Sequence, residues 1–116
     1  MNWLRGADAE TRALRHLERQ GLKLVARNWR CKGGELDLVM RDGEALAIIE
    51  VRSRGRSDYG SALESIDARK RGHLVHATQL FLAAHAEHAQ REIRFDVVAL
   101  DGNQLHWLKA AFDVDA

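Results

Sequence analysis

The sequence predicts an α/β domain in which helices flank a mixed β-sheet with a hairpin in its middle. Three observations predict this architecture: a helical apolar pattern near the N-terminus, two apolar runs on either side of the turn dipeptide Asp42-Gly43, and a second helical pattern followed by two short apolar runs. With 116 residues, of which 46% are hydrophobic, the chain is expected to form a single domain over residues 1–116 with a sizeable core.

The predicted elements follow in the order α-β-β-β-α-β-β. The first helix spans residues 7–20, because apolar residues recur at helical spacing until Gly21 ends the pattern. The second helix spans residues 62–89 and follows a polar loop at residues 53–61. Apolar runs bounded by turn residues predict the strands, which cover residues 22–29, the hairpin 34–54, and residues 93–100 and 104–108.

Three carboxylates, those of Glu35, Asp37 and Glu50, interrupt the apolar runs of the hairpin. If Asp42-Gly43 forms the two-residue loop, Glu35 lies directly opposite Glu50 on the neighbouring strand. One face of the hairpin then gathers the charged side chains Glu35, Asp37, Glu50 and Arg52 at one end. The other face carries only apolar residues and is expected to be core. A bulge or a loop of odd length would reverse the parity and separate the charged side chains.

Charge and composition exclude some classes of protein and leave nucleic-acid binding open. The net charge is only +1, and we expect neither a leader segment nor a membrane span. The single cysteine forms no internal disulfide and is typical of a cytoplasmic protein. Basic residues cluster locally in three groups that could bind phosphate or could be solvated surface, namely Arg27, Arg30 and Lys32, then Arg52, Arg54 and Arg56, and then Arg69, Lys70 and Arg71.

One acidic residue, Glu10, falls on the apolar stripe of the first predicted helix. It lies four residues before Leu14 and seven before Leu17, so the three side chains project from the same face. A carboxylate at this place could interact with the helix dipole, which is worth about 0.3–1 kcal/mol. Alternatively, Glu10 faces the acidic end of the hairpin.

The stripe of the second predicted helix contains a lysine. Lys70 lies among the apolar residues Leu63, Ile66, Leu74, Ala77 and Phe81. Because lysine is rarely buried without a partner, Lys70 either extends to the edge of the sheet or reaches an anionic site. The hairpin carboxylates favour the anionic site.

Other candidate motifs are weak. The pairs His73–His76 and His85–His88 have the spacing of zinc ligands, but the only cysteine is distant, so we interpret them as solvated helix surface. Cys31 has no evident histidine to orient it as a nucleophile. Gly33-Gly34 lacks the Lys-Ser/Thr of a phosphate-binding loop.

The carboxylates of the hairpin indicate a hard divalent cation, Mg²⁺ or Mn²⁺, because such ions prefer oxygen ligands. Asp37 and Glu50 are the expected ligands, and Arg52 would lie beside a phosphate. The reaction that this arrangement favours is hydrolysis of a phosphodiester bond, since a bound cation acidifies water and neutralises charge in the transition state.

These residues resemble a known motif and a known family. Asp37 followed by Glu50-Val-Arg52 is similar to the D…(D/E)-x-K pattern of restriction-endonuclease-like nucleases. Over nearly its whole length, the chain resembles the YraN family of small bacterial proteins, which are related to archaeal Holliday-junction resolvases. The matching pieces are Gly6–Glu10, Asn28-Trp-Arg, Gly34–Leu38, Glu50-Val-Arg52, Tyr59-Gly60, Lys70 and Arg94–Val98.

The resemblance implies a metal-dependent endonuclease-like core centred on Glu10, Asp37, Glu50 and position 52, with Glu10, Asp37 and Glu50 as metal ligands. The usual lysine of the pattern is Arg52 here, and arginine does not act as a general base. Either the metal centre supplies the base, or Lys70 supplies the missing amine, or catalysis has been lost and binding remains.

We therefore expect a metal-dependent endonuclease that acts on DNA, including branched or otherwise structured DNA, in the cytoplasm. The alternatives are a non-catalytic nucleic-acid-binding module on the same fold and a structural protein with solvated carboxylates. RNA as a substrate and a homodimeric state stay open, although resolvase relatives pair to cut two strands. The candidate nucleic-acid-binding residues are Arg27, Arg30, Lys32, Arg54, Arg56 and Tyr59.

Overall fold

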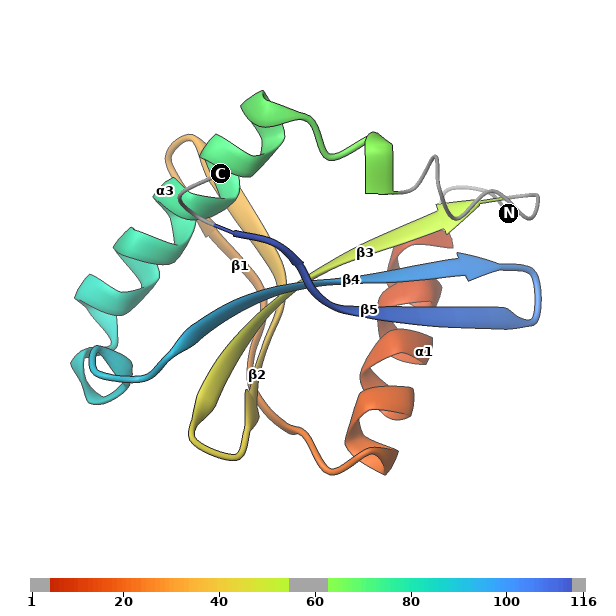
Figure 1. Cartoon of the computed structure of the whole chain (residues 1–116), viewed down its shortest axis with the longest axis horizontal. Helices are drawn as coiled ribbons and strands as arrows, with labels where there is room; N and C mark the ends of the chain where they lie inside the picture. The colour runs from red at the N-terminus through yellow and green to blue at the C-terminus, as the bar shows by residue number, and fades with distance from the viewer. Residues whose placement is uncertain (1–4, 55–62, 114–116) are drawn as a thin grey trace.

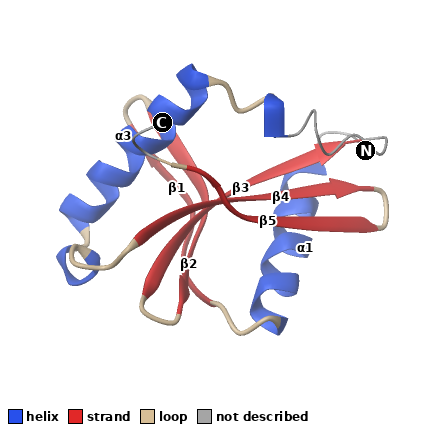
Figure 2. Ribbon diagram, viewed as in Figure 1, coloured by secondary structure: helices blue, strands red, loops and turns tan. Residues whose placement is uncertain are grey.

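The computed structural model describes residues 5–54 and 63–113. Five strands form one mixed sheet in the order β1-β2-β3-β4-β5, in which β3 and β4 are parallel and the other neighbours antiparallel (Figure 1, Figure 2). The predicted α/β architecture with a hairpin in the middle is confirmed. The elements are α1 (Arg5–Arg19), β1 (Lys23–Cys31), β2 (Gly34–Asp42), β3 (Ala45–Arg54), α3 (Ala68–Ala84), η2 (Ala86–His88), β4 (Ile93–Asp101) and β5 (Gln104–Phe112).

Helix α1 ends where the sequence predicts. Its buried residues Ala9, Ala13 and Leu17 recur every four positions and face the sheet. Gly21 adopts a left-handed φ of +98°, and the backbone N–H of Leu22 donates to the Leu17 carbonyl at 3.0 Å. This is the glycine-dependent helix end in which the chain reverses and packs its next apolar residue onto the last turn.

The two helices cover opposite faces of the sheet, so the core has two layers. Neighbouring residues of the central strands alternate between the layers. Ile49 and Val98 pack in the cluster that contains α1, whereas Ile48 and Val97 pack in the cluster that contains α3. Both faces of the middle strands are therefore buried, as is usual for a strand in a parallel pair with a helical crossover.

The register of the hairpin differs from the prediction. Asp42 pairs with Ala45, so the loop consists of Gly43 and Glu44 and not of Asp42 and Gly43. Gly43 has a φ of +63°, which suits the first position of a two-residue hairpin loop. Asp42 stays in the strand because its carboxylate is held by Arg94 at 2.9 Å. The shift is by two residues, so the parity of the facing side chains is unchanged.

A second difference concerns the faces of β2. Leu36 packs on the α3 side, whereas Leu38 packs on the α1 side, although the predicted alternation of the strand places residues two apart, such as these, on the same apolar face. The alternation of faces is therefore interrupted between Leu36 and Leu38. In β1, Asn28 lies between the partners of these two residues and has a left-handed φ of 54°.

The predicted pairing of Glu35 with Glu50 is also wrong, because the β2–β3 register is shifted by two residues and its paired residues end at Leu38 and Ile49. Glu35 has its strand partner, Arg30, in β1.

Helix α3 is shorter than the predicted helix over residues 62–89. It begins at Ala68 because the side chain of Asp67 caps it, accepting a hydrogen bond from the Lys70 backbone N–H at 2.9 Å. Leu74, Ala77 and Phe81 of the predicted stripe are buried, as is Ile66 ahead of the helix, but Leu63 is 37% exposed and the prediction is wrong there.

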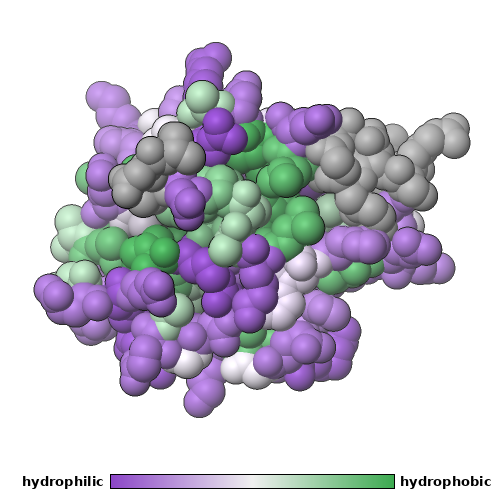
Figure 3. All heavy atoms as spheres, in the orientation of Figure 1, coloured by the Kyte–Doolittle hydropathy of each residue, from purple (hydrophilic) through white to green (hydrophobic). Residues whose placement is uncertain are grey.

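The edge strands are longer than predicted, since β1 reaches Cys31 and β5 reaches Phe112. No helix in the described residues is long and apolar enough to cross a membrane. On the face seen in Figure 3, hydrophilic side chains rim a central band of hydrophobic ones.

Candidate functional site

The candidate site lies where β2 and β3 separate. The backbone pairing of these strands extends from Asp42 and Ala45 to Leu38 and Ile49. Beyond these residues, the side chain of Asp37 makes the next contact between the two strands. Its Oδ2 accepts a hydrogen bond from the backbone N–H of Val51 at 2.9 Å. A side-chain oxygen thus satisfies a strand N–H at the place where the ladder ends, and this contact fixes the Asp37 carboxylate against the backbone of β3.

Glu10 extends from α1 toward Asp37. This agrees with the expectation that Glu10 faces the acidic end of the hairpin. Its side chain is 14% exposed and lies 3.7 Å from Nε of Arg27, measured to Oε1. The guanidinium of Arg27 also donates to the Ala7 carbonyl and to Oγ1 of Thr11, so it fastens α1 to β1. Burial raises the pKa of Glu10, and the nearby charge of Asp37 raises it further, against the lowering effect of a hydrogen bond from Asn28.

Three carboxylates meet in this region. One oxygen from each of Glu10, Glu35 and Asp37 lies within 4.8 Å of the others, and all three side chains are partly buried. Glu35 also pairs with Arg30, whose side chain is largely exposed, at 3.6 Å. The cluster therefore combines one helix residue with two residues of β2.

Glu50 adjoins this cluster from β3 and is buried. Its Oε2 lies 3.1 Å from Nη2 of Arg52 and 3.5 Å from Nζ of Lys70. Burial is the main cause that raises the pKa of Glu50 to about 7, and the charge of Asp37 adds to it, while Lys70 and Arg52 lower it. The other oxygen, Oε1, is buried and receives no hydrogen bond.

These residues fit a divalent cation. The donors are carboxylate oxygens, which Mg²⁺ and Mn²⁺ prefer. Glu50 Oε1 is a buried acceptor without a donor, a costly arrangement that either a proton or a cation relieves. Among the described residues, Asp37 forms no ion pair with a basic side chain, unlike Glu10, Glu35 and Glu50. Positive charge is thus lacking at the centre of the group.

The structure brings together all five predicted catalytic residues, Glu10, Asp37, Glu50, Arg52 and Lys70, at one end of the hairpin. The composition of the carboxylate group differs in one respect from the predicted ligand set. Glu35 closes the group with Glu10 and Asp37, whereas Glu50 contacts it from the side of Lys70.

The predicted nucleic-acid-binding residues have different surroundings. Arg30 and Lys32 are exposed near the β1–β2 turn, but Arg27 is engaged with α1 and Glu10. Arg56 and Tyr59 lie outside the described residues, as does the side chain of Arg54.

Asn28 is a site residue to which sequence reasoning assigned no role. It has a left-handed φ within β1, and its side chain hydrogen-bonds Glu10. Asparagine tolerates this backbone conformation better than most residues. An asparagine within a predicted strand was the available signal, because asparagine is depleted in strands.

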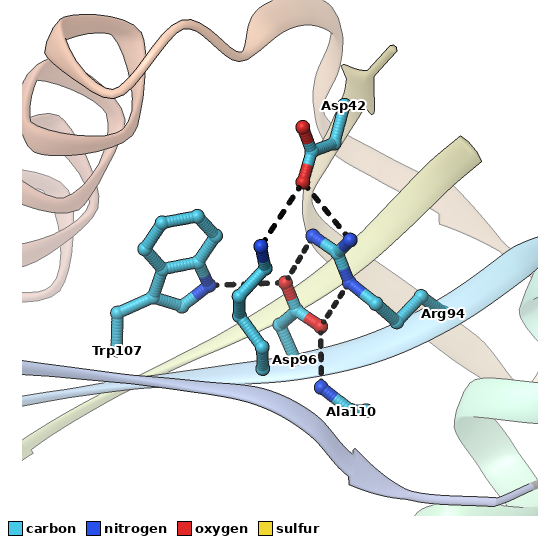
Figure 4. A network of polar contacts seen from close by, with 6 residues as sticks. Asp42, Arg94, Asp96, Trp107 and Ala110 are labelled. Atoms are coloured by element: carbon cyan, nitrogen blue, oxygen red, sulfur yellow. Dashed lines mark hydrogen bonds and ion pairs between the residues drawn. The ribbon is translucent and has the colours of Figure 1, made fainter. Parts of the chain in front are cut away.

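Asp96, buried in the middle of β4, belongs to a separate network (Figure 4). Its two oxygens accept hydrogen bonds from Arg94, from Nε1 of Trp107 at 3.0 Å and from the backbone N–H of Ala110 at 3.0 Å. Arg94 also pairs with Asp42, five residues along β2 from Asp37, which corresponds to about 17 Å of strand. All acceptors are satisfied, so this network holds β5 against β4 and the hairpin.

The interpretation of the histidines is half right. His73 and His76 are exposed, but His88 is buried and His85 stacks on Phe81 with ring centroids 4.0 Å apart. Nδ1 of His88 accepts a hydrogen bond from Arg91. The second pair is therefore part of the core beside α3, because aromatic rings pack there.

Comparison with known proteins places the chain in a family. Residues 9–100 match the family described as "Uncharacterised protein family UPF0102", a range that contains Glu10, Asp37, Glu50, Arg52 and Lys70. The chain belongs to the UPF0102 family. The resemblance to the YraN family is thereby confirmed, since the two names denote the same family.

UPF0102 proteins from several bacteria are similar to this chain over almost their full length. The chain is 54% identical to one from Pseudomonas fluorescens (strain Pf0-1) over 110 residues, which is 93% of this chain and 92% of the relative. It is 51% identical to one from Ectopseudomonas mendocina (strain ymp), covering 93% of each, and 51% identical to one from Dechloromonas aromatica (strain RCB), covering 96% and 90%.

Proposed function

We propose that this protein is a metal-dependent endonuclease that hydrolyses phosphodiester bonds in DNA. The observation that carries the proposal is the convergence of Glu10, Asp37 and Glu50 from three elements, with a buried Glu50 oxygen that has no donor. Such a group costs stability unless it binds a cation, so a function is the physical reason to keep it. A cytoplasmic location is part of this proposal.

Glu10, Asp37 and Glu50 would hold Mg²⁺ or Mn²⁺, and Glu35 is close enough to join them. Such an ion, when bound, acidifies water and neutralises charge on the phosphate. The residues of the chain have separate tasks beside it. Asp37 is fixed by its hydrogen bond from Val51, so its other oxygen has a defined position.

Arg52 and Lys70 both contact Oε2 of Glu50, so they hold this carboxylate in place and favour its ionised form. Arg52 has a planar guanidinium with five donors, of which one nitrogen contacts Glu50, and its side chain is 27% exposed. It can therefore also donate to phosphate oxygens. Lys70, which is 34% exposed, is a point charge that can orient water or phosphate.

Cleavage of DNA by the purified protein tests the proposal. Branched and linear DNA should be incubated with Mn²⁺, Mg²⁺ or EDTA, with RNA as a parallel substrate. We expect product with Mn²⁺ or Mg²⁺ and none with EDTA or with Asp37→Asn. Asp8→Asn is the matched control, because Asp8 is exposed on α1. The Asp8→Asn variant should cleave DNA as the wild type does. Equal cleavage by Asp37→Asn and the wild type would contradict the proposed site.

A second candidate function is nucleic-acid binding without cleavage on the same fold. The observation that favours it is the ion pair of Arg52 with Glu50, because an arginine at the place of the usual lysine removes one candidate base. Binding of DNA with no cleavage of any substrate in Mn²⁺ would support this alternative over the endonuclease.

A further inference from the structure

A basic groove runs along α1, away from the carboxylate cluster. It is a hollow of about 370 Å³ between α1 and the turn that joins β4 to β5. In Figure 1, this turn and α1 lie at the same end of the molecule. We call it the α1 groove, and it is lined by Arg12, Arg15, His16, Arg19, Asn103 and Leu105.

The three arginines form a row. Arg12, Arg15 and Arg19 are spaced three and four residues apart, so they lie on one side of α1 and rise about 4.5 Å and 6 Å along its axis. Like charges at these spacings destabilise a helix by about 0.2–0.5 kcal/mol per pair. The row therefore has a cost that an anionic ligand would offset.

The guanidinium groups of the row have no carboxylate partner among the described residues. In the described part of the chain, none of these three arginines forms an ion pair, and no acidic residue lines the groove. Five of the eight other arginines whose side chains the structure describes behave differently: Arg27, Arg30, Arg52, Arg91 and Arg94 each pair with a carboxylate. The α1 groove is thus a concentration of positive charge that faces solvent.

The shape and chemistry of the groove fit a chain of phosphates. One guanidinium group can bind two oxygens of the same phosphate, and a row of guanidinium groups matches a ligand whose phosphates also follow one another in a row. A membrane surface fits less well, because a helix that binds lipid inserts large apolar side chains. The exposed large apolar residues of the described chain are Leu24, Leu63 and Leu80, and none of them lines the groove.

The position of the groove relative to Glu10 restricts how a nucleic acid could use both. Glu10 faces the sheet with Ala13 and Leu17, whereas Arg12, Arg15 and Arg19 lie on the other side of the same helix. A helix with its side chains is about 10–12 Å across. One short strand at the carboxylates would not reach the groove, but a second backbone segment of a duplex or a branched molecule would.

We infer that the α1 groove binds the sugar–phosphate backbone of a nucleic acid, as a second contact separate from the carboxylate cluster. The inference rests on the proposed function for the choice of ligand. It names the class of substrate more narrowly, as a nucleic acid with at least two backbone segments close together. Binding in the groove itself requires neither metal nor cleavage.

Salt-dependent binding of a linear DNA duplex in EDTA tests the inference. Each phosphate contact contributes about 0.9 to the slope of log affinity against log salt concentration. We expect Arg15→Gln to lower the magnitude of the slope by about 0.9, and the triple change of Arg12, Arg15 and Arg19 to Gln to lower it by about 2–3. Arg15→Lys keeps the charge and should largely keep the slope.

Lys109→Gln is the matched control, because it removes one positive charge from a side chain that already pairs with Asp42 at 3.6 Å. Its slope should equal that of the wild type. Melting temperatures of all variants verify that they fold. Slopes that do not change in the triple variant would overturn the inference, and so would binding to phosphatidylserine vesicles without binding to duplex.

The failure of the proposed function has a different signature. If the wild type cuts no substrate in Mn²⁺ but the groove variants show a smaller salt dependence of DNA affinity, the nucleic-acid site in the α1 groove is supported and the endonuclease activity is not. If the wild type cuts DNA and the triple variant binds and cuts DNA equally well, the endonuclease activity is supported and nucleic-acid binding in the α1 groove is not.

Discussion

The Asp37 carboxylate accepts a hydrogen bond from the Val51 backbone N–H at 2.9 Å, so one side chain both ends the β2–β3 ladder and faces the carboxylate cluster. The two roles can be separated. Asparagine keeps an acceptor oxygen for Val51 but removes the charge, whereas alanine removes both. Variants at this position therefore distinguish a structural from a chemical contribution.

We expect Asp37→Asn to fold at least as stably as the wild type in EDTA, because the charge that raises the pKa of Glu50 is gone. Asp37→Ala should lose about 1–3 kcal/mol of stability, since the Val51 N–H is left without its partner. Chemical denaturation measures both values. An Asn variant as unstable as the Ala variant would show that the charge, and not the hydrogen bond, holds the strands together.

The pH dependence of stability should carry the signature of Glu50. Its pKa is raised from the ordinary 4.5 to about 7, so the folded state binds more protons than the unfolded state between these values. Stability contributed by protonated Glu50 is complete below about 4.5 and is lost as the pH rises to about 7. One pKa unit corresponds to about 1.4 kcal/mol, so a rise of the pKa from 4.5 to about 7 corresponds to a loss of about 3 kcal/mol.

Glu50→Gln isolates this effect, because glutamine has the same shape and does not titrate. The difference in unfolding free energy between the wild type and this variant should change with pH from 4.5 to 7 in the stated direction. A difference that stays constant over this range would mean that Glu50 titrates normally.

Metal binding should become stronger as the pH rises, whereas the stability contributed by protonated Glu50 decreases. A divalent cation that binds only the folded state raises the melting temperature, and ligands must lose their protons to bind it. We therefore expect Mn²⁺ to raise the melting temperature more at pH 8 than at pH 5.5, where Glu50 is protonated. Asp37→Asn should reduce the shift at both values. An equal shift in Asp37→Asn would place the cation elsewhere.

The sequence was sufficient for the arrangement of the hairpin and helices, because apolar periodicity and Gly21 have local physical causes. It was not sufficient for the hairpin register or for the residue at which α3 begins. The hairpin register depends on the contact of Asp42 with Arg94, which is 52 residues away in the chain. The N-terminal limit of α3 depended on Asp67, whose type is a common cap but whose position was not recognised as one.

The approach of Asp37 and Glu50 to each other was predictable from the sequence, whereas the place of Glu35 beside Glu10 and the role of Asn28 were not. Parity along β2 and β3 indicated that Asp37 and Glu50 approach each other, and this survived a register shift by an even number of residues. The proximity of Glu35 to Glu10 occurs where the alternation of β2 is interrupted, beside the left-handed Asn28 of the neighbouring strand. A contact between separate strands of this kind has no local sequence pattern.

Asp96→Asn should destabilise the fold without affecting the chemistry of the site. The Asp96 side chain is fully buried, and replacing its charge leaves Arg94 without its main partner. The expected loss is about 3–5 kcal/mol. Any cleavage per folded molecule should be unchanged, since the network lies at the other end of the hairpin. Asp101→Asn, at the more exposed end of β4, is the control for stability.

Arg52 and Lys70 contact the same oxygen of Glu50, yet their side chains should contribute differently to the proposed reaction. Arg52 has a fork suited to two phosphate oxygens, so Arg52→Ala should weaken both DNA binding and cleavage. Lys70 lowers the pKa of Glu50 more than Arg52 does, so Lys70→Ala should mainly reduce cleavage. It should also move the acidic limb of the pH–rate profile to higher pH, because Glu50 must then lose its proton without this neighbour.

Binding and product formation should be measured for both variants at one salt concentration, since phosphate contacts depend on salt. Lys109→Ala is the matched control, because this lysine pairs with Asp42 at the distant end of the hairpin and should leave the pH–rate profile unchanged. If Lys70→Ala lowers binding as much as Arg52→Ala and leaves the profile in place, Lys70 acts on the nucleic acid and not through Glu50. A larger shift of the profile in Lys70→Ala than in Arg52→Ala would identify the Lys70–Glu50 contact as the main one that sets the working pH.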